Sequence, residues 1–116
     1  MSKKDICEIK SIRDDTVSDV SQKIESHDIM HETSDLFKVL SNCTRVRILA
    51  ALSKKELCVC ELSLILDISQ SNISHQLRYL RHSNIVKYRK DNKKIYYSLY
   101  DDDISKIIEK GIEFIK

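Results

Sequence analysis

The chain contains no proline, no tryptophan and a single glycine among its 116 residues. Proline and glycine interrupt helices, so their scarcity favours helix over most of the chain and leaves little sheet. The shortage of glycine also excludes a phosphate-cradling glycine loop, and no carboxylate pair has the spacing of an acid–base catalyst. We therefore predict that the protein is not an enzyme and takes no small organic substrate.

Long apolar runs are missing as well. No stretch approaches the roughly 20 apolar residues that a membrane-spanning helix needs. The polar start Met1-Ser2-Lys3-Lys4 does not have the apolar core of a signal peptide. We expect a cytoplasmic protein with no membrane partner. In that compartment the four cysteines, at positions 7, 43, 58 and 60, are expected to be free or metal-bound rather than paired in disulfides.

The length allows one domain with a modest core, since 41% of the residues are hydrophobic. We assign residues 1–28 to an N-terminal arm with a weak helix, and residues 29–116 to the domain. A chain this short often gains stability from a dimer interface or a bound metal.

Charge is distributed unevenly although the net charge is only +2. Residues 1–40 carry 6 basic and 9 acidic side chains, residues 41–100 carry 11 and 4, and residues 101–116 carry 3 and 5. Within residues 69–97, Asp91 is the one acid against seven basic residues. A basic middle between acidic ends favours one face that binds a polyanion over a merely solvated charged surface.

Apolar residues at helical spacing predict a series of short helices. A weak stripe covers residues 12–26, and a second helix runs from about His31 to Leu40 with Leu36 and Phe37 on its apolar face. Thr44 is the expected N-cap of a third helix. The inward stripe of that third helix comprises Val46, Leu49, Ala50 and Leu52. The fourth helix covers residues 58–66, through Cys58, Leu62, Ile65 and Leu66.

A turn at residues 67–70 separates this fourth helix from the next one. Ser69 or Ser71 is the expected cap of a helix over about residues 70–82. Its apolar stripe is Ile73, Leu77 and Leu80, and its other sides are polar and basic. A short helix, a tight turn and a helix of this kind are typical of the helix-turn-helix motif.

Two β-branched and aromatic segments follow, residues 85–89 and 95–99, joined by a polar turn at residues 90–94. They predict a hairpin, or wing, with a basic tip. The chain ends in a helix with an isoleucine stripe, which either covers the core or forms a dimer interface; we favour the interface. The stripe comprises Ile104, Ile107, Ile108, Ile112 and Ile115. The predicted fold is mainly α with a small β-hairpin: a homodimeric winged helix-turn-helix.

The candidate DNA contacts lie on the helix at 70–82 and on the wing. Ser69, Gln70, Ser71 and Ser74 suit phosphate contacts near the helix N-terminus. Gln70 and His75 can reach base edges, and Arg78 can contact either base or phosphate. From the wing, Arg89, Lys93 and Lys94 can contact the backbone or the minor groove. Taken singly, each is equally well a solvated surface residue. A two-fold dimer predicts a palindromic operator with half-sites about 34–36 Å apart, or at multiples of that distance.

Two cysteines, Cys58 and Cys60, lie at the start of the fourth helix. Residues two apart diverge within a helix but can converge at its first turn, where the helix dipole also favours thiolate. Thiolates select zinc, cadmium, lead, copper(I) or arsenite. Two sulfurs are too few for tight binding, and Cys7 is the best third ligand. Cys43 is expected to be a buried or idle thiol.

The chain resembles the ArsR/SmtB family of metal-sensing repressors, most closely its CadC-type cadmium/lead repressors. The resemblance covers roughly residues 35–104. It rests on the segment at 40–49, on Glu56-Leu57-Cys58-Val59-Cys60-Glu61-Leu62, on the helix at 70–78 and on Tyr96-Tyr97-Ser98-Leu99. The arm around Cys7 also looks like the start of CadC-type chains.

This resemblance implies a homodimer that occupies the promoter of a metal-efflux operon and leaves it when metal binds. The implied ligands are Cys58, Cys60 and Cys7, with the arm cysteine coming from the same or the other protomer. Ser11 stands where CadC-type arms have a second cysteine, so the implied site has three sulfurs unless Cys43, a carboxylate or water joins. Because Ser63 stands near where arsenic repressors have a third cysteine, arsenite is less expected than cadmium or lead.

A second family site uses Asp and His on the C-terminal helices. Asp101 matches it, but Asp103 and Phe114 stand where histidines are expected, so we expect that site to be lost or weak. Our hypothesis is a repressor that binds operator DNA as a dimer and dissociates when Cd(II), Pb(II) or Zn(II) binds its cysteine site. Two alternatives are a thiol-redox-responsive DNA-binding regulator and a metal-storage protein.

Overall fold

The computed structural model describes residues 12–116, which fall into two compact units divided between Ser34 and Asp35. In the first unit, α1 (Asp14–Lys23) is a short helix with no buried residue. Acidic residues in its first turn and Lys23 in its last complement the helix dipole, and Lys23 pairs with Asp19 at 3.1 Å. The helix predicted over residues 12–26 is therefore confirmed, with narrower bounds.

Helix α2 (His27–Leu40) begins four residues before the predicted start at His31. The signal for the earlier start is Ser26, whose hydroxyl oxygen accepts the backbone N–H of Ile29 at 3.3 Å. Leu40 is buried, but Phe37 is 56% exposed. Of the predicted apolar face, Leu36 and Leu40 thus contact the core, while Phe37 is left exposed.

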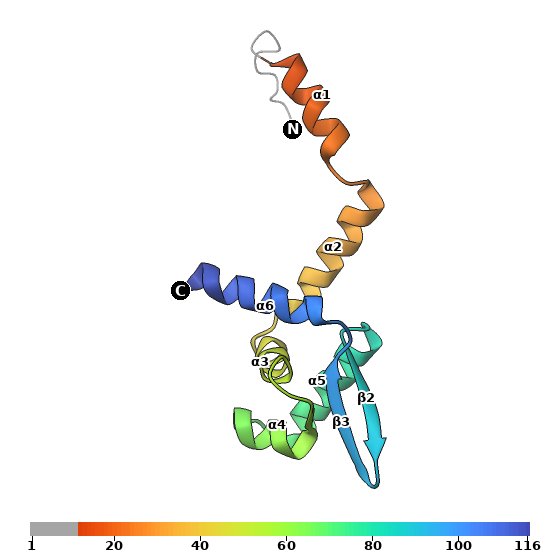
Figure 1. Ribbon diagram of the computed structural model, residues 1–116, viewed down its shortest axis with the longest axis vertical. Coiled ribbons are helices and arrows are strands. Elements are labelled where there is room, and N and C mark those ends of the chain that lie inside the picture. The colour runs from red at the N-terminus through yellow and green to blue at the C-terminus, as the bar shows by residue number, and fades with distance from the viewer. Residues whose placement is uncertain (1–11) are drawn as a thin grey trace. The chain divides into compact units, whose positions relative to one another are not determined.

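The second unit contains the remaining elements (Figure 1). They are α3 (Cys43–Leu52), β1 (Leu57–Cys58), α4 (Val59–Leu66), α5 (Gln70–His82), β2 (Val86–Asp91), β3 (Lys94–Leu99) and α6 (Asp102–Ile115). Helices α3, α4 and α5 pack around one core, and the hairpin β2–β3 extends beside them as a long ribbon. The side chains with no exposed surface are Ile48, Leu49, Leu62, Ile73, Leu77 and Leu80.

The start and the packing of α3 differ from the prediction. Asn42, and not Thr44, is its N-cap: the Asn42 side-chain oxygen accepts the Arg45 N–H at 3.0 Å. In the core, Ile48 lies beside Leu49, whereas Val46 is only partly buried.

The small sheet has the order β1–β3–β2, with both pairs antiparallel. The hairpin is confirmed, but its loop is tighter than predicted: only Asn92 and Lys93 separate the strands, and Asn92 takes a left-handed conformation with φ 58°. Asparagine tolerates this conformation better than most residues. The two-residue strand β1, which pairs with β3, was not predicted from the sequence.

Helix α6 begins after Asp101, whose side chain accepts the Asp103 N–H at 2.8 Å. Its first half covers the core through Ile104 and Ile108, which are 8% and 6% exposed. Its second half is exposed: Ile112 is 42%, Phe114 88% and Ile115 82% accessible. The helix thus has a packed beginning and an uncovered apolar end.

Candidate nucleic-acid interface and thiol site

The turn before α5 fixes where this helix starts. Asp67 ends α4 in a left-handed conformation with φ 56°, and the Ser69 hydroxyl oxygen accepts the Asn72 N–H at 3.2 Å. Ser69 is therefore the cap, one of the two serines that the sequence offered, and α5 has the predicted bounds 70–82. The structure confirms the helix-turn-helix arrangement of α4 and α5.

The two sides of α5 have opposite character. Ile73, Leu77 and Leu80 have no exposed surface, which locks the orientation of the helix against the core. The predicted contact residues Ser69, Gln70, Ser71, His75 and Arg78 are exposed, and Ser74 is half-buried. These six side chains are therefore available to a ligand, at and after a helix N-terminus whose free N–H groups favour phosphate.

Arg45 on α3 connects α5 with the end of α2, a role that the sequence did not reveal. Its Nε donates to the Val39 carbonyl at 2.6 Å and a terminal nitrogen donates to Gln76 Oε1 at 3.2 Å. The guanidinium also lies 4.4 Å from the centroid of the Tyr79 ring. Gln76 and Tyr79 belong to α5, so Arg45 helps to set the rotation of this helix about its axis.

The wing presents positive charge at its tip, where Lys93 and Lys94 are exposed. Arg89 lies further back on β2 and is already paired. Its Nε and a terminal nitrogen donate to the two carboxylate oxygens of Glu56 at 2.9 and 2.8 Å. Asp91 lies 3.6 Å from the remaining terminal nitrogen. Arg89 is thus exposed, as a DNA contact must be, but its guanidinium has a carboxylate partner within the chain.

Cys58 ends β1 and caps α4, with the extended backbone angles φ −94° and ψ 171°. As predicted, one of the two thiols precedes the helix while Cys60 lies in its first turn. Cys58 is 7% exposed, whereas Cys60 is exposed. Of the apolar residues on the same helix, Leu62 and Leu66 are buried in the core, whereas Ile65 is 58% exposed.

Glu61 completes a capping box with Cys58. A Glu61 carboxylate oxygen accepts the Cys58 backbone N–H at 3.0 Å. This N–H and, to a lesser extent, the Cys58 side chain lower the pKa of the Glu61 carboxyl. The box keeps the Cys58 backbone extended at the start of α4.

The donor types suit a thiophilic ion, since Cys58, Cys60 and Cys43 all carry free thiols. Within residues 12–116, no three His, Cys, Asp or Glu side chains lie close enough together to hold a metal. Cys7, the predicted third ligand, lies outside the described residues. Cys43 was expected to be a buried or idle thiol. It is exposed, because it is the first residue of α3, so the expectation that it is buried was wrong.

The residues of the second family site have other roles. Asp101 caps α6 and Asp103 lies 3.4 Å from Lys106. Phe114 is a solvent-facing aromatic near the end of the helix.

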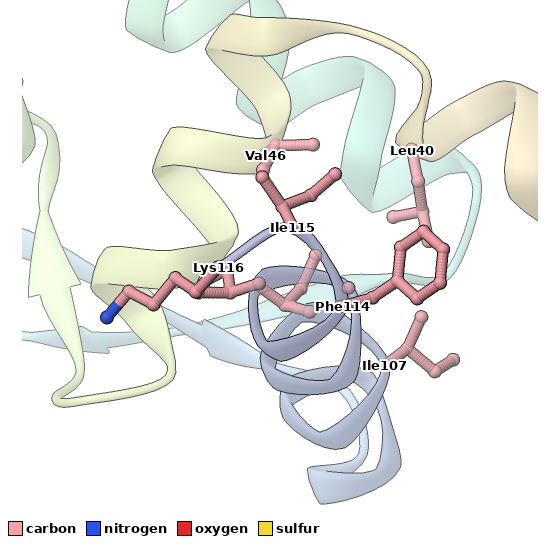
Figure 2. A pocket seen from close by; sticks show the side chains of 9 residues that line it. Leu40, Val46, Ile107, Phe114, Ile115 and Lys116 are labelled. Atoms are coloured by element: carbon pink, nitrogen blue, oxygen red, sulfur yellow. The ribbon is translucent and has the colours of Figure 1, made fainter.

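The uncovered end of α6 borders an apolar groove of about 500 Å³. Figure 2 shows the side chains that line it, from α6 and from the ends of its neighbours. Those from α6 include Ile107, Phe114 and Ile115, while Leu40 comes from α2 and Val46 from α3.

None of the helices among the described residues is long and apolar enough to cross a membrane.

Comparison with known proteins relates the chain to one family of bacterial transcriptional regulators. Residues 42–88 match the model of the family described as bacterial regulatory protein, arsR family. A cadmium resistance transcriptional regulatory protein CadC homolog of Staphylococcus aureus is 40% identical, over 93% of this chain and 89% of that protein. A transcriptional repressor SmtB homolog of Synechocystis is 34% identical, over 96% and 84%.

Among solved structures, HlyU from Vibrio cholerae aligns with a TM-score of 0.71 and 31% identity, covering 77% of this chain and 97% of that one. A structure of reduced HlyU from the same organism aligns with a TM-score of 0.64 and 35% identity, over 70% and 90%. The match to relatives spans nearly the whole chain and agrees with the helix-turn-helix and wing described above. The chain therefore belongs to the ArsR family, whose members are winged helix-turn-helix transcriptional regulators and not enzymes.

Proposed function

We propose that this protein is a metal-responsive repressor that binds operator DNA as a homodimer and dissociates when its cysteine site captures Cd(II), Pb(II) or Zn(II). The observation that carries the proposal is the position of the thiol box. Cys58 belongs to a strand that is paired with the wing, and it caps the helix that precedes the reading helix α5. A change at the thiols therefore bears directly on both DNA-contacting elements.

In this proposal, Cys58 and Cys60 hold the ion together with Cys7 from the same or the other protomer. Both box thiols would bind as thiolates, so capture releases their protons, and affinity rises with pH. Cadmium, lead and zinc all accept such a sulfur-rich donor set. The second family site is proposed to be lost, since Asp101 serves as a helix cap and Phe114 offers no ligand atom.

The proposed DNA surface comprises Ser69, Gln70, Ser71, Ser74, His75, Arg78, Arg89, Lys93 and Lys94. Gln70, His75 and Arg78 are proposed to read bases, and the serines and wing residues to contact phosphate. Replacing Lys93 should weaken binding to all DNA sequences alike. It should also make the slope of log affinity against log salt concentration shallower by about one. Replacing Arg78 should instead relax sequence preference if it reads a base.

The proposed dimer interface is the uncovered end of α6 with its groove (Figure 2). Exposed isoleucine and phenylalanine side chains at the end of a helix are apolar surface that a second copy can cover. A homodimer would present two reading helices to a palindromic operator.

A titration of Cd(II) into a preformed protein–operator complex, followed by fluorescence anisotropy, tests the function. We expect release of the DNA, with a loss of affinity of about 5- to 150-fold, and a matching loss of metal affinity when DNA is bound. Cys58→Ser with Cys60→Ser should abolish the response. Cys43→Ser is the control: it removes another exposed helix-start thiol and should leave the response intact. Cadmium-independent operator binding by the wild type would refute the proposal.

Thiol oxidation is the second candidate for the inducing signal. It is favoured by the exposure of Cys60 at a helix start and by the likeness to a protein whose structure is described as reduced HlyU. Peroxide in metal-free buffer distinguishes the two. Oxidative release of the operator without a cadmium response would favour the redox function, whereas the opposite result favours metal sensing.

A further inference from the structure

Glu56 and Arg89 form the one two-pronged ion pair described within residues 12–116. Two nitrogens of the guanidinium meet both oxygens of the carboxylate, at 2.8 and 2.9 Å, although the residues are 33 positions apart. Planar, bidentate pairs of this kind restrict the side chains more than a single contact does.

The pair joins two segments that are already connected by the sheet. Glu56 directly precedes β1, whose Cys58 is the register partner of Tyr96 on β3. Tyr96 is also the register partner of Arg89 on β2, and the Arg89 guanidinium lies 5.0 Å from the centroid of the Tyr96 ring. The thiol-bearing strand is thus attached to the wing twice, once through backbone pairing and once through this ion pair.

We infer that Glu56 is a positioning residue that locks the Arg89 side chain and, through it, makes the wing move with the thiol box. The inference rests on the proposed function, which it deepens by naming the wing as the element that responds to ion capture. In the DNA-free protein, the role of Arg89 is then to hold Glu56, and its guanidinium is not free to contact phosphate.

The physical reason is the shortness of β1. A strand of two residues is a weak attachment by itself, and the wing extends beyond the core as a two-stranded ribbon. Without the ion pair, a displacement of Cys58 could be absorbed by bending between β1 and β3. With it, the segment at 56–58 and the base of the wing behave as one body, and Arg89 cannot turn toward phosphate without leaving Glu56.

The test compares Glu56→Gln with Asp91→Asn. Both remove one negative charge near Arg89, so their general electrostatic effect on DNA binding is matched. Only the first breaks the link to the box, because Asp91 lies on the wing itself, 3.6 Å from Arg89. Operator affinity is measured by anisotropy with and without Cd(II), using a duplex selected from a random pool by the metal-free protein, and Cd(II) affinity is measured without DNA.

We expect Glu56→Gln to bind Cd(II) with wild-type affinity. The factor by which Cd(II) lowers operator affinity should, however, be at least about fivefold smaller in this variant than in the wild type. Asp91→Asn should keep the wild-type change. An unaltered change in Glu56→Gln, or equal losses in both variants, would overturn the inference.

Hydrogen exchange gives a readout that does not depend on metal. The amides of residues 57–58 and 96–97 should exchange faster in Glu56→Gln than in Asp91→Asn or the wild type, since the second attachment is gone. If Cd(II) does not change the operator affinity of the wild type, the proposed function fails. The exchange rates then decide by themselves whether Glu56 positions the wing. Unchanged exchange in Glu56→Gln would show that it does not.

Discussion

The helix-turn-helix and the end of α6 differ in how far their apolar side chains are exposed to solvent. Leu62 and Leu77 have no exposed surface, whereas Phe114 is 88% and Ile115 82% exposed. The helix-turn-helix therefore completes its core within this unit of the chain, while the end of α6 carries exposed apolar surface, which we propose a second copy covers. Stability and assembly are consequently expected to respond to different substitutions.

The largest expected effect concerns two leucines of α4 that lie two residues apart. Leu62→Ala leaves a cavity in the core and should lower the free energy of unfolding by about 2–5 kcal/mol. Leu64 is 83% exposed, so Leu64→Ala should change it by less than about 0.5 kcal/mol. Urea unfolding followed by circular dichroism measures both, and similar losses in the two variants would show that Leu62 contributes no more to the core than Leu64 does.

The next effect concerns assembly. Phe114→Ser combined with Ile115→Ser removes the apolar end of α6 and should weaken dimerisation by at least about tenfold, or 1.4 kcal/mol. Sedimentation equilibrium measures this change. The control Glu109→Ser alters an exposed polar position of the same helix and should leave the dimer intact. A double variant that still dimerises normally would place the interface elsewhere.

A smaller effect is expected where α3 begins. Asn42→Ala removes the side-chain acceptor of the Arg45 N–H and should cost about 1 kcal/mol of unfolding free energy. Thr44→Ala, at the position that the sequence pattern favoured, should cost clearly less because Thr44 is inside the helix. The same urea experiment ranks the two, and a larger loss for Thr44→Ala would reverse the assignment of the cap.

The smallest effect is a pH dependence at the thiol box. The pKa of Glu61 is lowered in the folded protein by the Cys58 N–H, so the carboxylate adds stability above its ordinary value near 4.5. This stability is lost as the pH falls through the lowered pKa. Glu61→Gln should therefore flatten the loss of stability below about pH 4.5 in urea titrations. An unchanged acid profile would mean that the box contributes nothing there.

Local patterns explain what was predictable. The sequence predicts α5 at 70–82 because its cap, its stripe of Ile73, Leu77 and Leu80 and its preceding turn all lie within 16 residues and agree with one another. At α3, Asn42 and Thr44 are both good caps, and the sequence does not say which oxygen meets a free N–H. In α4 the pattern names Leu62, Ile65 and Leu66 as apolar but does not say which of them face the core, because the inward face of so short a helix depends on its neighbours.

The sequence alone determined the order of helices and hairpin, the reading helix with its polar face and the thiol box at a helix start, because these depend on spacing and on side-chain chemistry. Tertiary structure decided that β1 pairs with β3, that Arg45 holds α5 and that Glu56 meets Arg89. Each of these contacts joins residues about 30 to 40 positions apart, and no local periodicity reports which distant partner a strand or a guanidinium will find.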